Sequence, residues 1–196
     1  ELTKELDETK QAAEAAVVAA ALLFGRPLKW IEDRYENLIS ANQAREQEMT
    51  LQLAFDAQGR LLGCHATGAI NNGAYPTVAD CNIAPIVFLW SAYKMPAFGF
   101  LTQGIYSNTV GLAAYRGPWA IIALARETAF DVAARRIGID PIELRRRNII
   151  GEADLPHRTP LGVAVVNIDP SRSLDVLLGS FDVAAFRVEQ QAARAQ

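Results

Sequence analysis

The residues with the clearest potential for chemistry lie in the short segment 114–119, which reads AYRGPW. Arg116 stands between an aromatic residue and a Gly-Pro pair, directly before a stretch that predicts a helix. The backbone N–H groups at a helix N-terminus, together with a guanidinium group, can bind an anion. The segment therefore predicts either an anion site or an ordinary tight loop, and the residues alone leave both interpretations open.

Two histidines and two cysteines are the other candidates for a metal site or a nucleophile. Cys64 and His65 are adjacent in a predicted strand, so their side chains point to opposite faces and cannot easily share one metal ion. His157 lies in a predicted loop without a partner at ligand spacing. Two cysteines are too few for a disulfide framework or a thiol metal site. We therefore expect structural or solvent-exposed roles for both histidines, and no metal ligands.

Two further patterns have ordinary structural interpretations. Residues 63–68 have the glycine spacing of a phosphate loop, but the Lys-Ser/Thr pair is absent and the segment lies within a predicted strand. Residues 145–147 are three arginines that follow an arginine pair at 135–136. We expect these arginines to complement helix dipoles; the alternative is a contact with another domain or a cofactor.

Composition limits the class of protein. The 196 residues are 51% hydrophobic and 21% charged, which is ordinary globular usage and excludes a disordered or collagen-like chain. The net charge is −3, so nucleic acid is a poor candidate partner. The longest apolar run, residues 15–24, is too short to span a bilayer, and its acidic flank argues against a signal peptide. These features favour a cytoplasmic protein without nucleic-acid or membrane partners.

The elements that must position the segment 114–119 are both helices and strands. Alternation of apolar and polar residues predicts a strand. Its buried face is expected to carry Met49, Leu51, Leu53 and Phe55. A turn at 56–59 leads to a partner strand over 61–70, and weaker signals predict strands over 28–32 and 97–107. Helices are expected over residues 3–24, 35–42, 83–93, from 119 to 137, from 141, over 171–178 and over 183–195.

These elements predict an α+β fold, with an antiparallel or mixed meander sheet covered by helices. We expect a single domain over residues 1–196. It would consist of a leading helix over 1–24, a sheet-rich part over 25–108 and a helical part over 109–196.

Six segments also match, in order, the motifs of one enzyme family. They are residues 25–34 (GRPLKWIEDR), 56–63 (DAQGRLLG), 71–75 (NNGAY), 106–117 (YSNT…AYRG), 139–148 (IDPIELRRRN) and 159–162 (TPLG). These segments resemble motifs of the large subunit of the molybdenum hydroxylases. That family includes xanthine dehydrogenase, aldehyde oxidase and aerobic carbon monoxide dehydrogenase. The resemblance covers about residues 25–190, and its strength lies in the order of the motifs.

The resemblance implies that the chain is an internal part of a molybdopterin-binding region. In that family the AYRG loop approaches molybdopterin, an anionic pyranopterin phosphate bound to molybdenum. The candidate cofactor-binding residues are therefore Tyr115, Arg116 and Gly117, and Gly117 would let the backbone approach a ligand closely. The implied reaction is hydroxylation of a carbon centre with water, on an aldehyde, purine, N-heterocycle or CO-like substrate. The implied partners are the rest of the large subunit and iron–sulfur and FAD subunits or domains.

The chain departs from the family pattern at several functional positions. No glycine precedes Gly25, whereas the family has a GGGFG loop before the first helix, and the family's catalytic Glu lies beyond the last residue. Glu127 matches no motif and is not a substitute. Gly117 replaces the Cys of the copper–molybdenum enzymes, which argues against that chemistry. We expect no catalytic residue in this chain and no molybdenum in the isolated chain; the alternative is a non-catalytic stand-alone α+β module that has lost the cofactor.

Overall fold

The computed structural model describes residues 8–44, 46–75, 83–113 and 120–195. The helices are α1 (Glu8–Phe24), α2 (Arg34–Ser40), α3 (Ala84–Val87), α4 (Ala120–Ile137), α5 (Pro141–Asn148), η1 (Glu152–Asp154), α6 (Pro170–Ser180) and α7 (Val183–Arg194). The strands are β1 (Gln47–Phe55), β2 (Leu61–Gly73), β3 (Phe98–Tyr106), β4 (His157–Arg158) and β5 (Ala164–Val165). Among the described helices, none is both long and apolar enough to cross a membrane.

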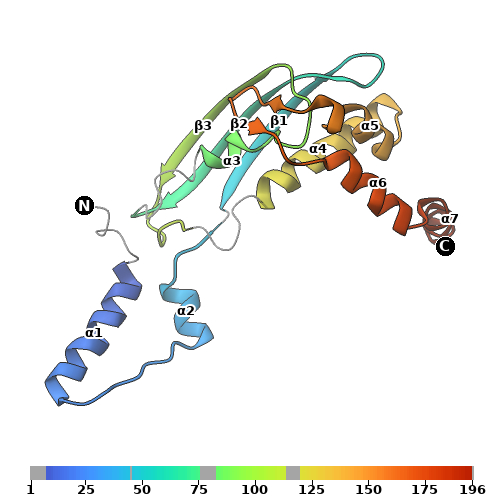
Figure 1. Cartoon of the computed structure of the whole chain (residues 1–196). Helices are drawn as coiled ribbons and strands as arrows, with labels where there is room; N and C mark the ends of the chain where they lie inside the picture. The colour runs from blue at the N-terminus through green and yellow to red at the C-terminus, as the bar shows by residue number, and fades with distance from the viewer. Residues whose placement is uncertain (1–7, 45, 76–82, 114–119, 196) are drawn as a thin grey trace. The chain divides into compact units, whose positions relative to one another are not determined.

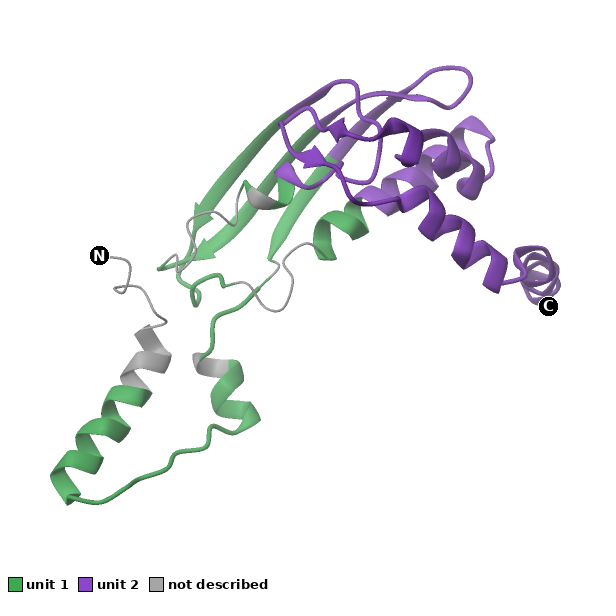
Figure 2. Cartoon of the chain, in the orientation of Figure 1, with its two compact units in different colours: residues 1–50, 66–86, 100–125 green, residues 51–65, 87–99, 126–196 purple. Residues whose placement is uncertain are grey.

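The chain divides into two compact units (Figure 2). Unit 1 comprises residues 1–50, 66–86 and 100–125, and unit 2 comprises residues 51–65, 87–99 and 126–196. The buried apolar residues of unit 1 are Ala66, Ile70, Ile86, Leu112 and Ile122. Those of unit 2 are Leu61, Cys64, Leu89, Trp90, Tyr93, Met95, Phe130, Ala134, Leu144, Ile150 and Val165. Both units therefore contain buried apolar residues.

The main sheet has three strands in the order β1-β2-β3 (Figure 1). A short turn joins β1 to β2, so these two strands form an antiparallel hairpin. β3 runs parallel to β2: the Cys64 N–H donates to the Ala97 carbonyl at 2.9 Å, and further along both strands the Ser107 N–H donates to the Gly73 carbonyl at 3.3 Å. A parallel pair needs a crossover connection, which here passes through α3. The predicted α+β class with a mixed sheet is confirmed.

An aromatic cluster forms the centre of unit 2. Phe130 of α4 lies edge to face with Phe55 of β1, with ring centroids 5.9 Å apart. Phe130 also stacks on Tyr93, with ring centroids 4.5 Å apart, and its ring centroid lies 6.3 Å from that of Trp90. Phe130 is completely buried. This cluster packs α4 against the sheet within unit 2.

The alternation predicted for β1 is confirmed. Every second residue from Gln47 to Phe55 is half-buried and the residues between them are exposed. The face that carries Met49, Leu51, Leu53 and Phe55 is thus the covered one. These four residues are half-buried, so this face keeps partial contact with solvent.

We expect Leu53→Ala to lower the free energy of unfolding by about 1–2 kcal/mol. A fully buried leucine would lose roughly 2–5 kcal/mol, but Leu53 is half-buried. Gln52→Ala, on the exposed face of the same strand, should change the free energy by less than about 0.5 kcal/mol. Urea unfolding of both variants measures the difference, and equal effects would contradict the assignment of faces.

The strand predicted over residues 28–32 is wrong. These residues have no regular secondary structure. Trp30 and Ile31 are 43% and 72% exposed. The short apolar run has no partner strand among the described residues, and an isolated strand is not stable in water.

The helix predicted over residues 83–93 is also mostly wrong, because only the four residues of α3 are helical. The chain after α3 pairs instead with the last residue of α5 and with the segment that follows it. The Lys94 N–H donates to the Asn148 carbonyl at 2.8 Å, and the Ile150 N–H donates to the Ala92 carbonyl at 3.0 Å. These long-range hydrogen bonds replace the ones that a longer helix would have made.

Candidate functional site

The three residues predicted to bind a cofactor, Tyr115, Arg116 and Gly117, lie outside the described residues. The structure does describe the chain on both sides of them. The incoming stem consists of residues 107–113, and α4 begins directly after the segment 114–119. Both the incoming stem and the first turn of α4 belong to unit 1.

The incoming stem lies between two other segments of unit 1. On one side, the Gln43 N–H donates to the Gly111 carbonyl at 3.2 Å, and the Ala113 N–H donates to the Gln43 carbonyl at 3.0 Å. On the other side, the Leu112 N–H donates to the Asn72 carbonyl at 3.1 Å. The backbone that leads to Tyr115 is therefore held from both sides up to Ala113.

Side chains reinforce the start of this stem. Asn71 Oδ1 accepts hydrogen bonds from the Gly73 N–H at 2.9 Å and from the Ser107 hydroxyl at 2.8 Å. Asn71 Nδ2 donates to Glu46 Oε2 at 2.8 Å and to Thr109 Oγ1 at 3.4 Å. One amide thus connects the end of β2 to the incoming stem and to the residues before β1.

A glycine is required at position 73, where the incoming stem passes close to the end of β2. Its φ is +69°, a backbone conformation that L side chains rarely adopt. A Cβ at this position would lie 2.2 Å from the Val110 carbonyl oxygen. The turn signal at residues 71–73 therefore marks the place where the incoming stem crosses the end of β2.

The outgoing side of the segment 114–119 is the N-terminus of α4. The first turn of α4 contains no acidic residue, and Ile122 in this turn is buried. The incoming stem also has no carboxylate in its sequence. A helix N-terminus without acidic residues favours an anion through its dipole and its N–H groups.

The IDPIELRRRN segment has a structural role in unit 2. Asp140 caps α5 as predicted, accepting hydrogen bonds from backbone N–H groups of the first turn. At the other end, Asn148 Oδ1 accepts from the Leu61 N–H at 2.6 Å, and Asn148 Nδ2 donates to the Gly59 carbonyl at 2.8 Å. Asn148 is buried. The segment therefore fastens α5 to the turn between β1 and β2.

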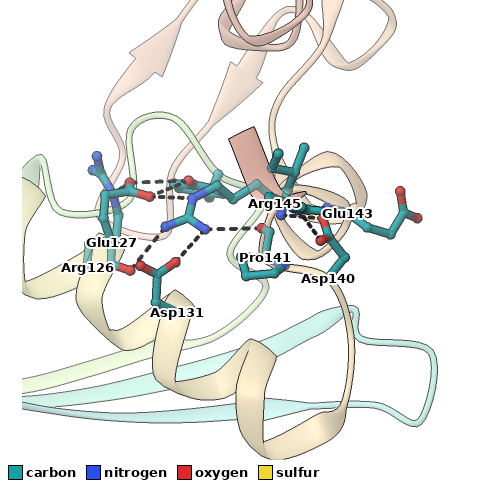
Figure 3. A network of polar contacts seen from close by, with 10 residues as sticks. Arg126, Glu127, Asp131, Asp140, Pro141, Glu143 and Arg145 are labelled. Carbon is teal, nitrogen blue, oxygen red and sulfur yellow. Dashed lines mark hydrogen bonds and ion pairs between the residues drawn. The ribbon is translucent and has the colours of Figure 1, made fainter. Parts of the chain in front are cut away.

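Arg145 is the centre of a polar network on α4 and α5 (Figure 3). Its Nε donates to Glu127 Oε2 at 2.9 Å and its Nη1 donates to Asp131 Oδ1 at 2.8 Å. Arg126 Nε donates to Glu127 Oε1 at 2.8 Å, and the Tyr93 hydroxyl lies 3.0 Å from Glu127 Oε2. The two arginines and the tyrosine occupy both oxygens of this glutamate.

The pKa values in the network follow from these contacts. Burial raises the pKa of Glu127, but the hydrogen bonds and charges of Arg126 and Arg145 outweigh burial and hold this pKa below its ordinary value of 4.5. Burial and the neighbouring Glu127 carboxylate raise the pKa of Tyr93. Glu127 is therefore an ionised, fully engaged structural carboxylate, and its geometry is unsuitable for a general base.

The other two arginines of α5 also form ion pairs within unit 2. Arg146 Nη1 lies 2.6 Å from Asp175 Oδ1, and Arg147 Nε lies 2.8 Å from Glu143 Oε1. Arg147 also donates to the Gln58 carbonyl. The arginines lie in the last turn of α5, as predicted. Arg146 contacts α6, whereas Arg147 contacts both α5 itself and the turn between β1 and β2.

Of the cysteine and histidine candidates, Cys64, His65 and His157 are described by the structure, and Cys81 lies outside the described residues. Cys64 is buried and His65 is exposed, which confirms that the two side chains point to opposite faces. Burial raises the pKa of the Cys64 thiol to about 12, so this cysteine is not a nucleophile at neutral pH. Half-buried His157 lies in β4. Within the described residues, no group of three or more His, Cys, Asp or Glu side chains could hold a metal ion.

Residues 9–149 match the family described as the molybdopterin cofactor-binding domain. The gamma subunit of the 6-hydroxypseudooxynicotine dehydrogenase complex of Paenarthrobacter nicotinovorans is 41% identical over 143 residues, which cover 70% of this chain and 18% of that relative. The nicotine 6-hydroxylase large subunit of the same organism is 34% identical over 174 residues, covering 86% of this chain and 21% of that relative. The chain thus spans about a fifth of the length of these relatives.

A solved structure agrees with the sequence matches. Quinoline 2-oxidoreductase from Pseudomonas putida 86 superposes with a TM-score of 0.85 at 33% identity, over 93% of this chain and 24% of that chain. The fold predicted from the motif order, part of a molybdopterin-binding domain, is confirmed. The N-terminus of α4 and the incoming stem, which have no carboxylate, fit the anionic phosphate of such a cofactor.

Proposed function

The chain belongs to the molybdopterin cofactor-binding domain family, and from this membership we propose that it is part of a molybdenum hydroxylase large subunit. In that subunit Tyr115, Arg116 and Gly117 contact the cofactor. The observation that carries the proposal is the family match over residues 9–149. The fixed stem and the helix start on either side of the segment 114–119 support it.

When bound, molybdopterin supplies the redox-active metal at which a carbon centre is hydroxylated with oxygen from water. The residues of this chain bind the cofactor and orient it. The Arg116 guanidinium offers a planar fork of N–H donors to the phosphate, and Gly117 lets the backbone approach it. The N-terminus of α4 adds a favourable dipole. We place the general base elsewhere in the subunit, because Glu127 is held in an ion-pair network.

We propose an N-heterocycle as the first substrate class to test. The names of two matched proteins, nicotine 6-hydroxylase and quinoline 2-oxidoreductase, support this choice. Aldehydes, purines and CO-like substrates are the other classes within the family resemblance. The names of two relatives describe a subunit of a complex and a large subunit, which supports partner subunits for this protein. We propose iron–sulfur and FAD subunits or domains as those partners, in the cytoplasm.

The proposal is tested on the purified subunit that contains this chain. Metal and pterin analysis should give molybdenum and molybdopterin in near-equal amounts, and an electron-accepting dye should be reduced with quinoline or a nicotine-like heterocycle. The isolated 196-residue chain should hold no molybdenum and reduce no dye. An intact subunit without molybdenum would favour the cofactor-free module instead, and stoichiometric molybdenum with turnover in the isolated chain would overturn the fragment interpretation.

A further inference from the structure

β3 (Phe98–Tyr106) is an edge strand, because among the described strands it pairs with β2 alone (Figure 1). The Ala97 carbonyl and the Ser107 N–H both bond to β2. The N–H and C=O groups of one residue point to the same side of a strand, and that side alternates from each residue to the next. The odd-numbered residues of β3 therefore bond towards β2, whereas Thr102 and Gly104 direct their backbone groups away from it.

The sequence of β3 lacks the features that protect a natural edge strand. Edge strands are usually short, or carry charged residues or proline, which discourage pairing with a further strand. β3 has nine residues (FGFLTQGIY), of which none is charged and none is proline. β1, at the other edge, carries Glu48, and none of its nine described residues is an exposed large apolar one. The sequence of β3 is therefore typical of a strand with a neighbour on each side.

β3 also exposes apolar side chains on both faces of the sheet. Leu101 and Ile105 share one face and are 60% and 48% exposed, and Tyr106 on the opposite face is 65% exposed. Apolar residues on both faces are typical of a strand inside a larger sheet. Such an edge suits an added strand, because main-chain hydrogen bonds supply the affinity and side-chain contacts supply the specificity.

We propose that the outer edge of β3, over residues 101–106, pairs with a β-strand of the same large subunit that lies outside residues 1–196. This inference rests on the proposed function, because it requires the chain to be part of a longer subunit. The chain spans about a fifth of the length of its relatives, so most of such a subunit is available to supply the strand. A strand in the same polypeptide is favoured over a second copy, because the covalent link raises its effective concentration.

Amide hydrogen exchange in the intact large subunit tests the pairing. Mass spectrometry with electron-transfer fragmentation resolves single amides, so each outward N–H is compared with an inward neighbour on the same strand. The N–H groups of Thr102 and Gly104 are expected to exchange at least about 100-fold more slowly than unstructured amides, and within about tenfold of those of Gln103 and Ile105, which point to β2. Exchange of Thr102 and Gly104 at the unprotected rate, with Gln103 and Ile105 still protected, would overturn the proposal.

A photo-cross-linker identifies the partner of β3. The intact subunit is made with p-benzoylphenylalanine in place of Ile105, and the cross-linked peptides are sequenced. The matched control carries the same group in place of Thr50, an exposed residue of β1 at the opposite edge of the sheet.

The Ile105 form is expected to link to one segment of its own polypeptide outside residues 1–196, and the Thr50 form should not link to that segment. A link from position 105 to a second copy, to another subunit or to residues within 1–196 would overturn the proposal. The proposed function fails separately: an intact subunit without molybdopterin would contradict it, whereas neither readout for β3 requires the cofactor.

Discussion

Arg145→Ala is expected to lower the free energy of unfolding by about 2–3 kcal/mol. The substitution leaves the Glu127 and Asp131 carboxylates without their shared cation, while the Arg145 side chain itself is only 17% exposed. Breaking a fully buried ion pair costs roughly 3–5 kcal/mol. The expected loss is smaller here, because the Glu127 side chain is 36% exposed to solvent and is still paired with Arg126. Urea unfolding measures the change.

Arg146→Ala is the matched control on the next residue of α5. Its ion pair with Asp175 is between side chains that are 43% and 54% exposed. An exposed pair of this kind contributes less than about 1 kcal/mol. If both variants lost the same free energy, the network of Arg145 would have no special structural role.

Phe130→Ala is expected to lower the free energy of unfolding by about 3–5 kcal/mol, as is usual for a fully buried phenylalanine. Phe130 is completely buried and contacts the rings of Phe55, Tyr93 and Trp90. Its removal leaves a cavity between α4 and the sheet, which the neighbouring rings fill only in part. A loss of near-ultraviolet circular dichroism from these aromatics should accompany the lower stability.

Leu124→Ala provides the control on α4, because Leu124 is 67% exposed. Its truncation should change the free energy of unfolding by less than about 0.5 kcal/mol. A Phe130→Ala variant as stable as the Leu124→Ala variant would contradict the aromatic core described here.

Local sequence signals predicted the parts of the fold that depend on local contacts. The period of two in β1 gave its covered face, and Asp140-Pro141 gave the start of α5. A capping box at Asp33 and Glu36, in which each side chain accepts from the other's backbone N–H, would have given the start of α2 at Arg34. Such patterns are readable because both partners lie within a few residues of each other.

What the sequence did not predict depends on distant segments of the chain. The helix predicted after α3 is replaced by backbone pairing with the segment after α5. The parallel pairing of β2 and β3 likewise depends on a crossover that no local pattern encodes. The charges of Arg145 and Glu127 are 18 residues apart in sequence, so their ion pair was not visible in the sequence.

The candidate site was predicted only in part. The motif order led to the family, which the comparisons confirm, whereas the assignment of Tyr115, Arg116 and Gly117 stays a prediction. Asn71 was noticed only as part of a turn signal and a motif. Its partners Glu46, Ser107 and Thr109 lie in two segments that are distant from Asn71 in sequence, so their convergence required the structure.

The most direct measurement is the molybdopterin content of the intact subunit carrying Arg116→Lys, taken together with its folding stability. Lysine keeps the positive charge but loses the planar fork of donors that matches a phosphate. We expect the cofactor content to fall to about a tenth of wild type or less, while the melting temperature of the cofactor-free subunit is unchanged. Full cofactor content with normal turnover, and only a lower melting temperature, would contradict the assignment and leave Arg116 as a structural residue.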